Sequence, residues 1–299
     1  MLDYLKNLLP STISQEKYDE LYKVLHEQYK EKEDPWGLSI DQLMKTVKLA
    51  YPLYKSYFKV QVFGTQHLEE KQYMIVSNHT GQIAIDGMLV TAAFLLDTPH
   101  PKLLRTMVER FITSLPFCGQ FFMENGAVLG DRSNCYHLLN RGESILVFPE
   151  GVKGIAKSTS EYYQIKNFTR GFFRLALRAK KDILPIAVIG AEEFYPYVHQ
   201  AKMIAKLLKL PALPVTPTFP LLGPLGLIPM PSPVDIHIGK PYAIPEDLSP
   251  DAPDNEIDEH VYKIEQAVKD LITIGLKQRR EFWGTPFISK YKPEQNPKG

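Results

Sequence analysis

The segment SNHTGQIAIDG, residues 77–87, holds a histidine and an aspartate that could together perform acid–base chemistry. Neutral imidazole takes a proton from a hydroxyl near neutral pH. A carboxylate beside it fixes the tautomer and stabilises the imidazolium that forms. His79 is therefore a candidate general base and Asp86 its orienting partner. Such a pair near a strand end is also compatible with a purely structural hydrogen bond, and this motif alone leaves both alternatives open.

Two further motifs carry charged groups that could bind a substrate. In NGAVLGDRS, Gly126 opens a short extended piece that ends at Arg132, whose planar guanidinium suits phosphate. In ILVFPEGVKG, a buried strand runs into Glu150 and Lys153, and open α/β sheets bind ligands at the carboxyl ends of their strands. The alternatives are a solvated arginine in the first motif and an ordinary Pro-Gly turn in the second.

A fourth motif, ILPIAVIG, places Pro185 inside an apolar strand. Proline has no N–H for a ladder hydrogen bond, so it is unusual in a central strand. We therefore expect an edge strand, a bulge or the wall of a pocket at Pro185.

These motifs need a scaffold, and the chain predicts one in which strands and helices alternate. Such alternation indicates an α/β fold with a mixed central sheet flanked by helices. Strands are expected at 58–64, 73–78, 126–129, 144–148, 183–190 and 234–239, and helices at 86–96, 102–113, 133–139, 170–180 and 256–280.

Two helices should precede this core. Ser14 is placed as the N-cap of a helix over 14–30, and Ser39 with Gln42 predicts a capping box for a second. Pro52 predicts a kink or break in the second helix. We expect N-terminal helices over 1–57, the α/β core over 58–245, a C-terminal helix packing on the core over 246–285, and a tail over 286–299.

Composition excludes some classes of protein. The 299 residues are 44% hydrophobic, which is enough for a proper core, and the net charge of +1 gives no global attraction to nucleic acid. Cys118 and Cys135 suggest no disulfide framework, so a reducing compartment is expected. The first apolar stretch is broken by Asp3, Lys6 and Pro10, unlike a signal peptide.

The segment AKMIAKLLKL, residues 201–210, places lysines on one helical face and apolar residues on the other. This pattern is typical of a helix at the surface of anionic lipid, although an amphipathic helix on the core is the alternative. The apolar run that follows, 210–234, is too rich in proline to form a membrane-spanning helix. We expect peripheral or monotopic attachment to the cytoplasmic face of a membrane, with contacts from Lys202, Lys206 and Lys209.

Taken in order, the four motifs resemble those of the glycerophospholipid acyltransferase family, the lysophosphatidate acyltransferase-like group, over roughly 58–244. The resemblance implies that His79, oriented by Asp86, deprotonates an acceptor hydroxyl, which then attacks an acyl thioester. It implies that Arg132 faces the phosphate of the acceptor. The remaining implied site residues are Gly126, Glu150, Gly151 and Lys153 around the acceptor, and Pro149 and Pro185 in the pocket wall.

The sequence departs from the family pattern in two places. Six residues separate His79 from Asp86, where the family has four. After Phe-Pro-Glu-Gly the family commonly has Thr-Arg, whereas this chain has Val152 and Lys153. A lysine supplies a point charge but no bidentate grip on phosphate.

The resulting hypothesis is an O-acyltransferase that acts on a lysophospholipid, glycerol phosphate or related glycerolipid at the membrane surface. The donor would be acyl-CoA or acyl-carrier protein, with no metal or other cofactor. The chain has no Gly-x-Ser-x-Gly motif, which favours direct transfer without an acyl-enzyme. Two alternatives remain: a lipid or thioester hydrolase that uses His79 to activate water, and a lipid-binding protein without activity.

Overall fold

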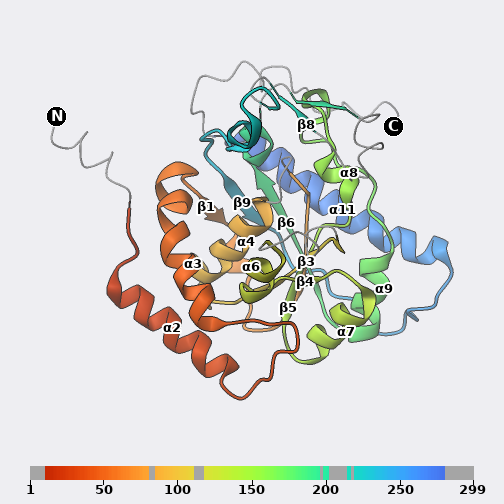
Figure 1. Cartoon of the computed structure of the whole chain (residues 1–299). Coiled ribbons are helices and arrows are strands. Elements are labelled where there is room, and N and C mark those ends of the chain that lie inside the picture. The colour runs from red at the N-terminus through yellow and green to blue at the C-terminus, as the bar shows by residue number, and fades with distance from the viewer. Residues whose placement is uncertain are drawn as a thin grey trace.

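The computed structural model describes residues 11–80, 85–110, 118–195, 198–201, 214–216 and 219–279. Within these residues, seven strands form one central sheet in the order β1-β9-β6-β2-β5-β3-β4. Helices cover both faces of this sheet (Figure 1). The predicted α/β class, with a mixed sheet and N-terminal helices, is confirmed.

Five neighbouring strands of the sheet run parallel to one another. Their carboxyl ends therefore lie along one edge, which is the edge that carries the histidine, Pro-Glu-Gly and arginine motifs. The other two strands run the opposite way, because β9 pairs antiparallel with β6 and parallel with β1. The parallel strands are β6 (Ile183–Ile189), β2 (Met74–Ser77), β5 (Ser144–Val147), β3 (Leu104–Val108) and β4 (Val128–Leu129), and the others are β9 (Asp235–Ile238) and β1 (Gln61–Phe63).

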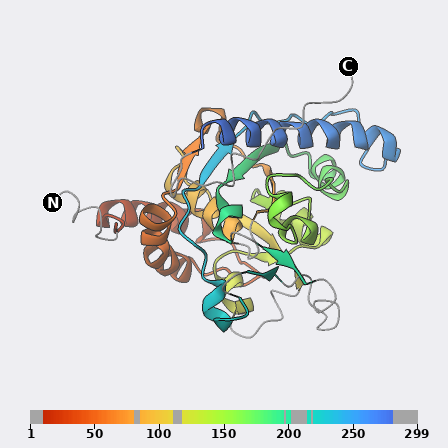
Figure 2. The ribbon, with the colours of Figure 1, turned by 90° about the horizontal axis from the view of Figure 1, so that it is seen from above.

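The two faces of the sheet bury different sets of side chains. In β2, Ile75 joins the core beneath the N-terminal helices, while Met74 and Val76 join the core on the other face. This alternation is the period of two that a strand imposes. The first face is covered by α2 (Gln15–Tyr29), α3 (Ile40–Pro52) and α4 (Ile85–Leu96), and the second by α7 (Arg132–Asn140), α9 (Gly171–Ala179) and α11 (Asp254–Lys277), as Figure 2 shows from above.

Shorter elements complete the described residues. A small antiparallel pair, β7 with β8, lies apart from the main sheet. The elements are α6 (Cys118–Glu124), α8 (Val152–Ile155), β7 (His199–Gln200), β8 (Pro214–Val215), the π turn η1 (Leu53–Tyr57) and the 3₁₀ turns η2 (Thr65–His67), η3 (Thr159–Glu161), η4 (Ala191–Phe194) and η5 (Gly223–Leu227).

The predicted helix starts are confirmed, but the capping box predicted for Ser39 and Gln42 is only half formed, because the Ser39 N–H donates to the carbonyl of Glu124 at 3.0 Å. The Ser14 hydroxyl accepts from the Lys17 N–H and the Ser39 hydroxyl from the Gln42 N–H, both at 3.3 Å. The α-helix α3 ends at Pro52, and the chain continues as the wider turn η1, closed by the Phe58 N–H bonding to the carbonyl of Leu53 at 2.8 Å.

The helix predicted over 102–113 is wrong, because residues 104–108 form strand β3. Arg105 in this strand is fully buried. A charged residue at a buried position broke the apolar pattern by which a strand is recognised, and it produced an apparent helical spacing instead.

Pro185 lies in β6, which has β9 and β2 on its two sides, so the expectation of an edge strand is wrong. Ile186 pairs with Ile238, whereas Ile183 pairs with Tyr242. The partner segment thus holds one more residue than β6 between the two pairs, which is a bulge opposite Pro185. The bulge accommodates a position that has no N–H to offer.

The described helices are each too short or too polar to cross a bilayer. Lys202, Lys206 and Lys209, which were expected to contact a membrane, lie outside the described residues, as does the expected tail over 286–299.

Candidate active site

The path of the chain at the end of β2 is set by Asn78. Its buried side-chain amide donates to the carbonyl of Val188 at 3.0 Å and accepts from the Val188 N–H at 2.9 Å. The side chain thereby imitates one more peptide of the parallel ladder with β6. The main chain is free to turn away from the sheet, and the next residue, His79, lies at the carboxyl edge.

His79 and Asp86 are in direct contact despite the longer gap. His79 Nδ1 lies 2.7 Å from Asp86 Oδ2. Asp86 is fully buried in the first turn of α4, where it also accepts from the Thr80 and Gly87 N–H groups, each at 2.8 Å. These two N–H donors hold the carboxylate in a fixed position at the start of the helix. A carboxylate oxygen 2.7 Å from Nδ1 accepts the Nδ1–H bond and so fixes the tautomer of His79.

The other ring nitrogen of His79, Nε2, is the candidate for accepting a proton. The imidazole stacks on Phe148, with ring centroids 4.2 Å apart and an interplanar angle of 19°. Its side chain is 11% exposed. Within the described part of the chain, Nε2 has no hydrogen-bond partner, so its lone pair is available to a substrate proton.

Glu150 contacts the main chain around the site. Its Oε1 accepts from the His79 N–H at 2.9 Å, and its Oε2 accepts from the Lys166 N–H at 2.7 Å. The side chain is buried and points inward, so it shapes the site through the backbone. Gly151 has φ +56°, a left-handed conformation that favours glycine, and it leads into α8.

Sequence reasoning missed Gly154, which packs directly on His79. A Cβ atom built at Gly154 would lie 2.6 Å from His79 Cβ and 3.0 Å from Glu150 Cβ. Atoms cannot approach so closely, so any larger residue would force α8 and His79 apart.

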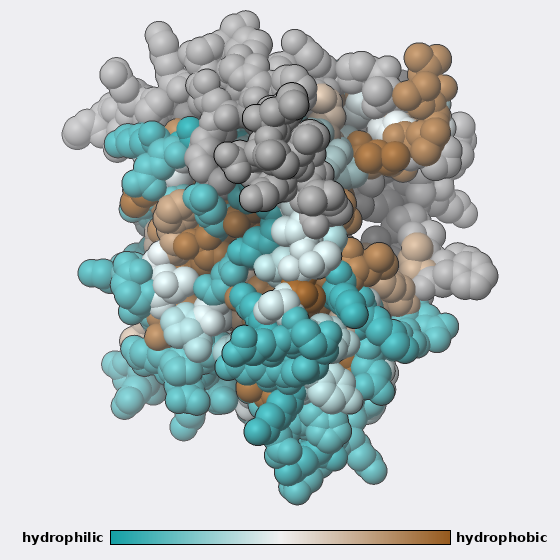
Figure 3. Space-filling view, turned by 90° about the vertical axis from the view of Figure 1, so that its left-hand side faces the viewer, coloured by the Kyte–Doolittle hydropathy of each residue, from teal (hydrophilic) through white to brown (hydrophobic). Residues whose placement is uncertain are grey.

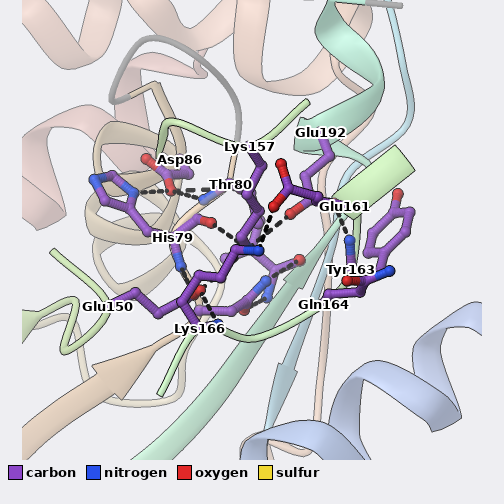
Figure 4. Close-up of polar contacts among 12 residues, drawn as sticks. His79, Thr80, Asp86, Glu150, Lys157, Glu161, Tyr163, Gln164, Lys166 and Glu192 are labelled. Atoms are coloured by element: carbon purple, nitrogen blue, oxygen red, sulfur yellow. Dashed lines mark hydrogen bonds and ion pairs between the residues drawn. The ribbon is translucent and has the colours of Figure 1, made fainter. Parts of the chain in front are cut away.

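Sequence reasoning also missed Lys157 and Glu192. Lys157 Nζ lies 3.2 Å from Glu150 Oε2, 3.1 Å from Glu192 Oε1 and 3.2 Å from the carbonyl oxygen of His79 (Figure 4). Burial acts to lower the pKa of Lys157, but attraction by the two carboxylates outweighs it and raises this pKa. Burial raises the pKa of Glu192 to about 7, against the opposing effect of Lys157.

Arg132 lies at a distance from this cluster. It is exposed at the start of α7 and lines a depression of about 870 Å³, together with residues of α9, α11 and the 167–169 loop. His79 does not line this depression. The two regions meet through the loop, since the Thr169 N–H donates to the carbonyl of the buried Pro149 at 3.3 Å.

The remaining predicted residues are dispersed. Lys153 is exposed on α8, close to the site. Gly126 lies before β4, at the opposite end of that strand from Arg132, and its carbonyl accepts from Arg105 Nε at 2.8 Å. Pro185 is buried in the sheet, where its carbonyl accepts from the Gly239 N–H at 2.9 Å. The described residues contain no group of three histidine, cysteine or acidic side chains arranged to hold a metal ion.

A parallel-sheet edge with a His–Asp pair and an unbonded Nε2 defines a candidate acid–base enzyme. Comparison with known proteins is more specific, since residues 59–189 match the acyltransferase family. The resemblance to glycerophospholipid acyltransferases is thereby confirmed, and this segment carries it.

Similar proteins come from several organisms. An uncharacterized protein of Mycobacterium tuberculosis is 36% identical over 203 residues, which is 67% of this chain and 57% of that protein. A 1-acyl-sn-glycerol-3-phosphate acyltransferase of Saccharomyces cerevisiae is 27% identical over 165 residues, 50% of each chain. The crystal structure of the 1-acyl-sn-glycerophosphate acyltransferase PlsC from Thermotoga maritima has the same fold, with a TM-score of 0.51 and 16% identity over 80% of this chain and 81% of that one. The chain thus spans little more than half of the first of these relatives and half of the second.

Proposed function

We propose that the protein is an O-acyltransferase that moves a fatty acyl group from an acyl thioester to a hydroxyl of a glycerolipid. The observation that carries the proposal is the buried His79–Asp86 contact of 2.7 Å, with Nε2 unbonded among the described residues. The yeast and Thermotoga proteins, both acyltransferases that act on 1-acylglycerophosphate, support the same chemistry.

The geometry suits direct transfer. The acceptor hydroxyl gives its proton to His79 Nε2 as its oxygen attacks the thioester carbonyl. The new C–O bond forms, the C–S bond breaks, and the imidazolium returns the proton to the departing thiolate. Asp86 stabilises the imidazolium between these steps, and Phe148 holds the ring plane.

Arg132 and Lys153 are the cationic groups proposed to face an acceptor phosphate. Arg132 lines the large depression beside the 167–169 loop, and Lys153 is exposed on α8, whose Gly154 contacts His79. An acceptor with a phosphate head, such as a lysophosphatidate, could reach Nε2 with its hydroxyl while its phosphate lies on this cationic side.

The test is acyl transfer by the purified protein, supplied with mixed acyl-CoA and either lysophosphatidate or monoacylglycerol, with products identified by mass. His79→Ala should reduce transfer by at least ~100-fold, the usual scale for a general base, without unfolding the protein. Arg132→Lys should raise the KM for lysophosphatidate and leave that for monoacylglycerol unchanged.

Each alternative has its own outcome. Free fatty acid as the sole product would identify a hydrolase. Undiminished turnover in His79→Ala would refute the mechanism, and lipid binding without turnover in the wild type would leave a binding protein. Equal changes of KM for both acceptors would assign Arg132 a structural role.

Membrane attachment is proposed from an apolar surface around η5. Figure 3, which shows the left-hand side of the molecule as drawn in Figure 1, has hydrophobic surface at its upper right. In the η5 segment, Leu221 is 83% exposed and Leu225 is 69% exposed. Leu222, Ile228 and Met230 in the same segment are also exposed, and a patch of this kind is typical of an interaction surface.

Flotation with anionic vesicles tests the attachment. Leu221→Ser with Leu225→Ser should lower vesicle affinity more than ~10-fold, because each buried leucine contributes about 1.5–3 kcal/mol. Ile274→Ser, an exposed position on α11 across the sheet, is the matched control. Failure of the wild type to float would refute membrane attachment.

A further inference from the structure

Both main-chain polar groups of His79 are bonded to side chains. Its N–H donates to Glu150 Oε1 at 2.9 Å, and its carbonyl accepts from Lys157 Nζ at 3.2 Å. The two side chains also pair with each other, with Lys157 Nζ 3.2 Å from Glu150 Oε2. An ion pair thus closes around the peptide groups of the candidate base, as Figure 4 shows.

The ion pair is itself held from a third side. Lys157 Nζ lies 3.1 Å from Glu192 Oε1, and Glu192 Oε2 accepts from the N–H of Tyr163. Glu192 follows the carboxyl end of β6, the strand beside β2. The lysine is therefore placed between groups fixed by two neighbouring strands, so its Nζ has a defined position.

This arrangement is costly if its purpose is stability alone. The side chains of Lys157, Glu150 and Glu192 are each at most 2% exposed. Desolvating ionic groups often costs more than their attraction returns, and apolar residues of similar volume serve a core as well or better. What the charged groups achieve, and apolar ones could not, is a grip on the N–H and carbonyl of His79.

We propose that Lys157 is a positioning residue for acyl transfer: with Glu150 it clamps the main chain of His79 and so fixes the direction in which Nε2 points. The inference rests on the proposed function. The imidazole direction is then set by three features, namely the clamped main chain, Asp86 at Nδ1 and Phe148 against the ring face. Gly154 lets α8 press on His79 Cβ and limits movement of the residue from the fourth side.

Loss of the Lys157 contacts should change the orientation of the His79 imidazole. With Lys157 removed, the His79 carbonyl loses its donor, and Glu150 loses the cation that holds its second oxygen. A displacement of about 1 Å at a reacting group can cost on the order of 100-fold in rate. Binding of either substrate would be unchanged, because Lys157 is buried.

The experiment compares four variants at saturating acyl-CoA and acceptor. Lys157→Gln should reduce kcat by about 100-fold with both KM values within about twofold of the wild type. Glu192→Gln, which keeps the Lys157–Glu150 pair, should stay within about threefold. Lys71→Gln removes a lysine at the other end of β2, paired with Asp182 at 2.9 Å, and is the control with unchanged kinetics.

The double variant Lys157→Gln, Glu192→Gln separates positioning from charge balance. Lys157→Gln alone leaves two buried carboxylates without a cation, and this variant is expected to be less stable. Removing the Glu192 charge should restore thermal stability but leave kcat low. If kcat returns to the wild-type value along with stability, Lys157 only balances charge and the proposal is overturned.

A readout independent of turnover keeps the clamp distinct from the proposed function. In protein with ¹⁵N-labelled histidine, His79→Ala assigns the Nδ1–H resonance bonded to Asp86. Lys157→Gln and the double variant should shift and broaden this resonance, and Lys71→Gln should leave it in place. An unmoved resonance in the double variant overturns the clamp. Absence of acyl transfer by the wild type overturns the proposed function instead, and the resonance still decides whether Lys157 fixes His79.

Discussion

Two buried ionic clusters lie at opposite ends of the central sheet. At the amino ends of the parallel strands, Arg105 Nη1 lies 2.6 Å from Asp34 and 3.4 Å from Glu143, and we call this the Arg105 cluster. At the carboxyl ends, Lys157 pairs with Glu150 and Glu192, which we call the Lys157 cluster. Each has one cation and two carboxylates, and both cations are almost fully buried.

The clusters differ in what their charges hold. The Arg105 cluster ties separate elements together, since Asp34 belongs to the α2–α3 connection and Glu143 accepts from the Tyr29 hydroxyl at 2.5 Å. In the Lys157 cluster, Glu150 and Lys157 bond both peptide groups of one residue, His79, and the two carboxylates also accept from the N–H groups of Lys166 and Tyr163. A buried charge therefore does not by itself indicate an active site. The indication comes from the residue that the charged groups bond, which here is the candidate base.

The largest expected effect is structural. Arg105→Met leaves Asp34 and Glu143 without their cation and should lower the free energy of unfolding by about 3–5 kcal/mol, the scale for breaking one side of a buried ion pair. Activity per folded molecule should remain that of the wild type. Urea unfolding and active-site-normalised kinetics measure the two quantities.

Arg178→Met is the matched control for Arg105→Met. Arg178 is 57% exposed and pairs with Asp251 on the surface, so its loss should cost under about 1 kcal/mol. A large fall in kcat per folded Arg105→Met molecule would break the comparison, because the Arg105 cluster would then also act on the site.

The second expected effect is on turnover. Gly154→Ala places a methyl 2.6 Å from His79 Cβ, so His79 or α8 must move. We expect kcat to fall by about 100-fold, with a loss of about 1–3 kcal/mol of stability from overpacking. Initial rates and thermal melts on the same samples measure both changes.

Gly171→Ala is the control for the alanine substitution itself, because its built Cβ has no atom within 4 Å outside its chain neighbours and its own helix backbone. Gly171 lines the depression that contains Arg132, so the kcat of this variant is compared at saturating acceptor. It should keep wild-type kcat and stability. Full activity in Gly154→Ala would mean that His79 tolerates displacement. Fixing the position of His79 would then not distinguish the Lys157 cluster from the Arg105 cluster.

Most of the fold was predictable because its strands obey simple rules. β2, β5, β6 and β9 are short apolar runs bounded by turn residues, and the helix caps at Ser14 and Ser39 follow from local hydrogen bonding. β3 was not predictable, since Arg105 is buried by partners distant in sequence. The bulge opposite Pro185 likewise depends on the residues of another strand.

The site was predictable only where its chemistry is local. His79 and Asp86 lie seven positions apart, and their contact agrees with the pattern in the sequence. Glu192 could have been found by the rule that drew attention to Glu150, because it also follows the carboxyl end of a buried strand. Lys157 gave no such signal, and Gly126 was placed with the acceptor although its carbonyl bonds Arg105.

The smallest expected effect is a pH-dependent one at Glu192. Burial raises its pKa from 4.5 to about 7, so the folded protein binds this proton more tightly than the unfolded chain does. The stabilising contribution of the proton on Glu192 is therefore complete below pH 4.5, and it is lost as the pH rises through about 7. Glu192→Gln stays neutral and avoids the loss. Its advantage in unfolding free energy over the wild type should widen by about 2 kcal/mol between pH 5 and pH 8.

Glu161→Gln supplies a control of opposite sign. Lys166 and the Ser158 N–H lower the pKa of Glu161 to about 2, so its stabilising contribution is present above pH 4.5 and lost only as the pH falls toward 2. That variant should be less stable than the wild type by a constant amount from pH 5 to pH 8. Urea unfolding at intervals across this range measures both differences. If the difference for Glu192→Gln is also flat, Glu192 does not titrate between pH 5 and pH 8, and its carboxylate stays paired with Lys157 across this range.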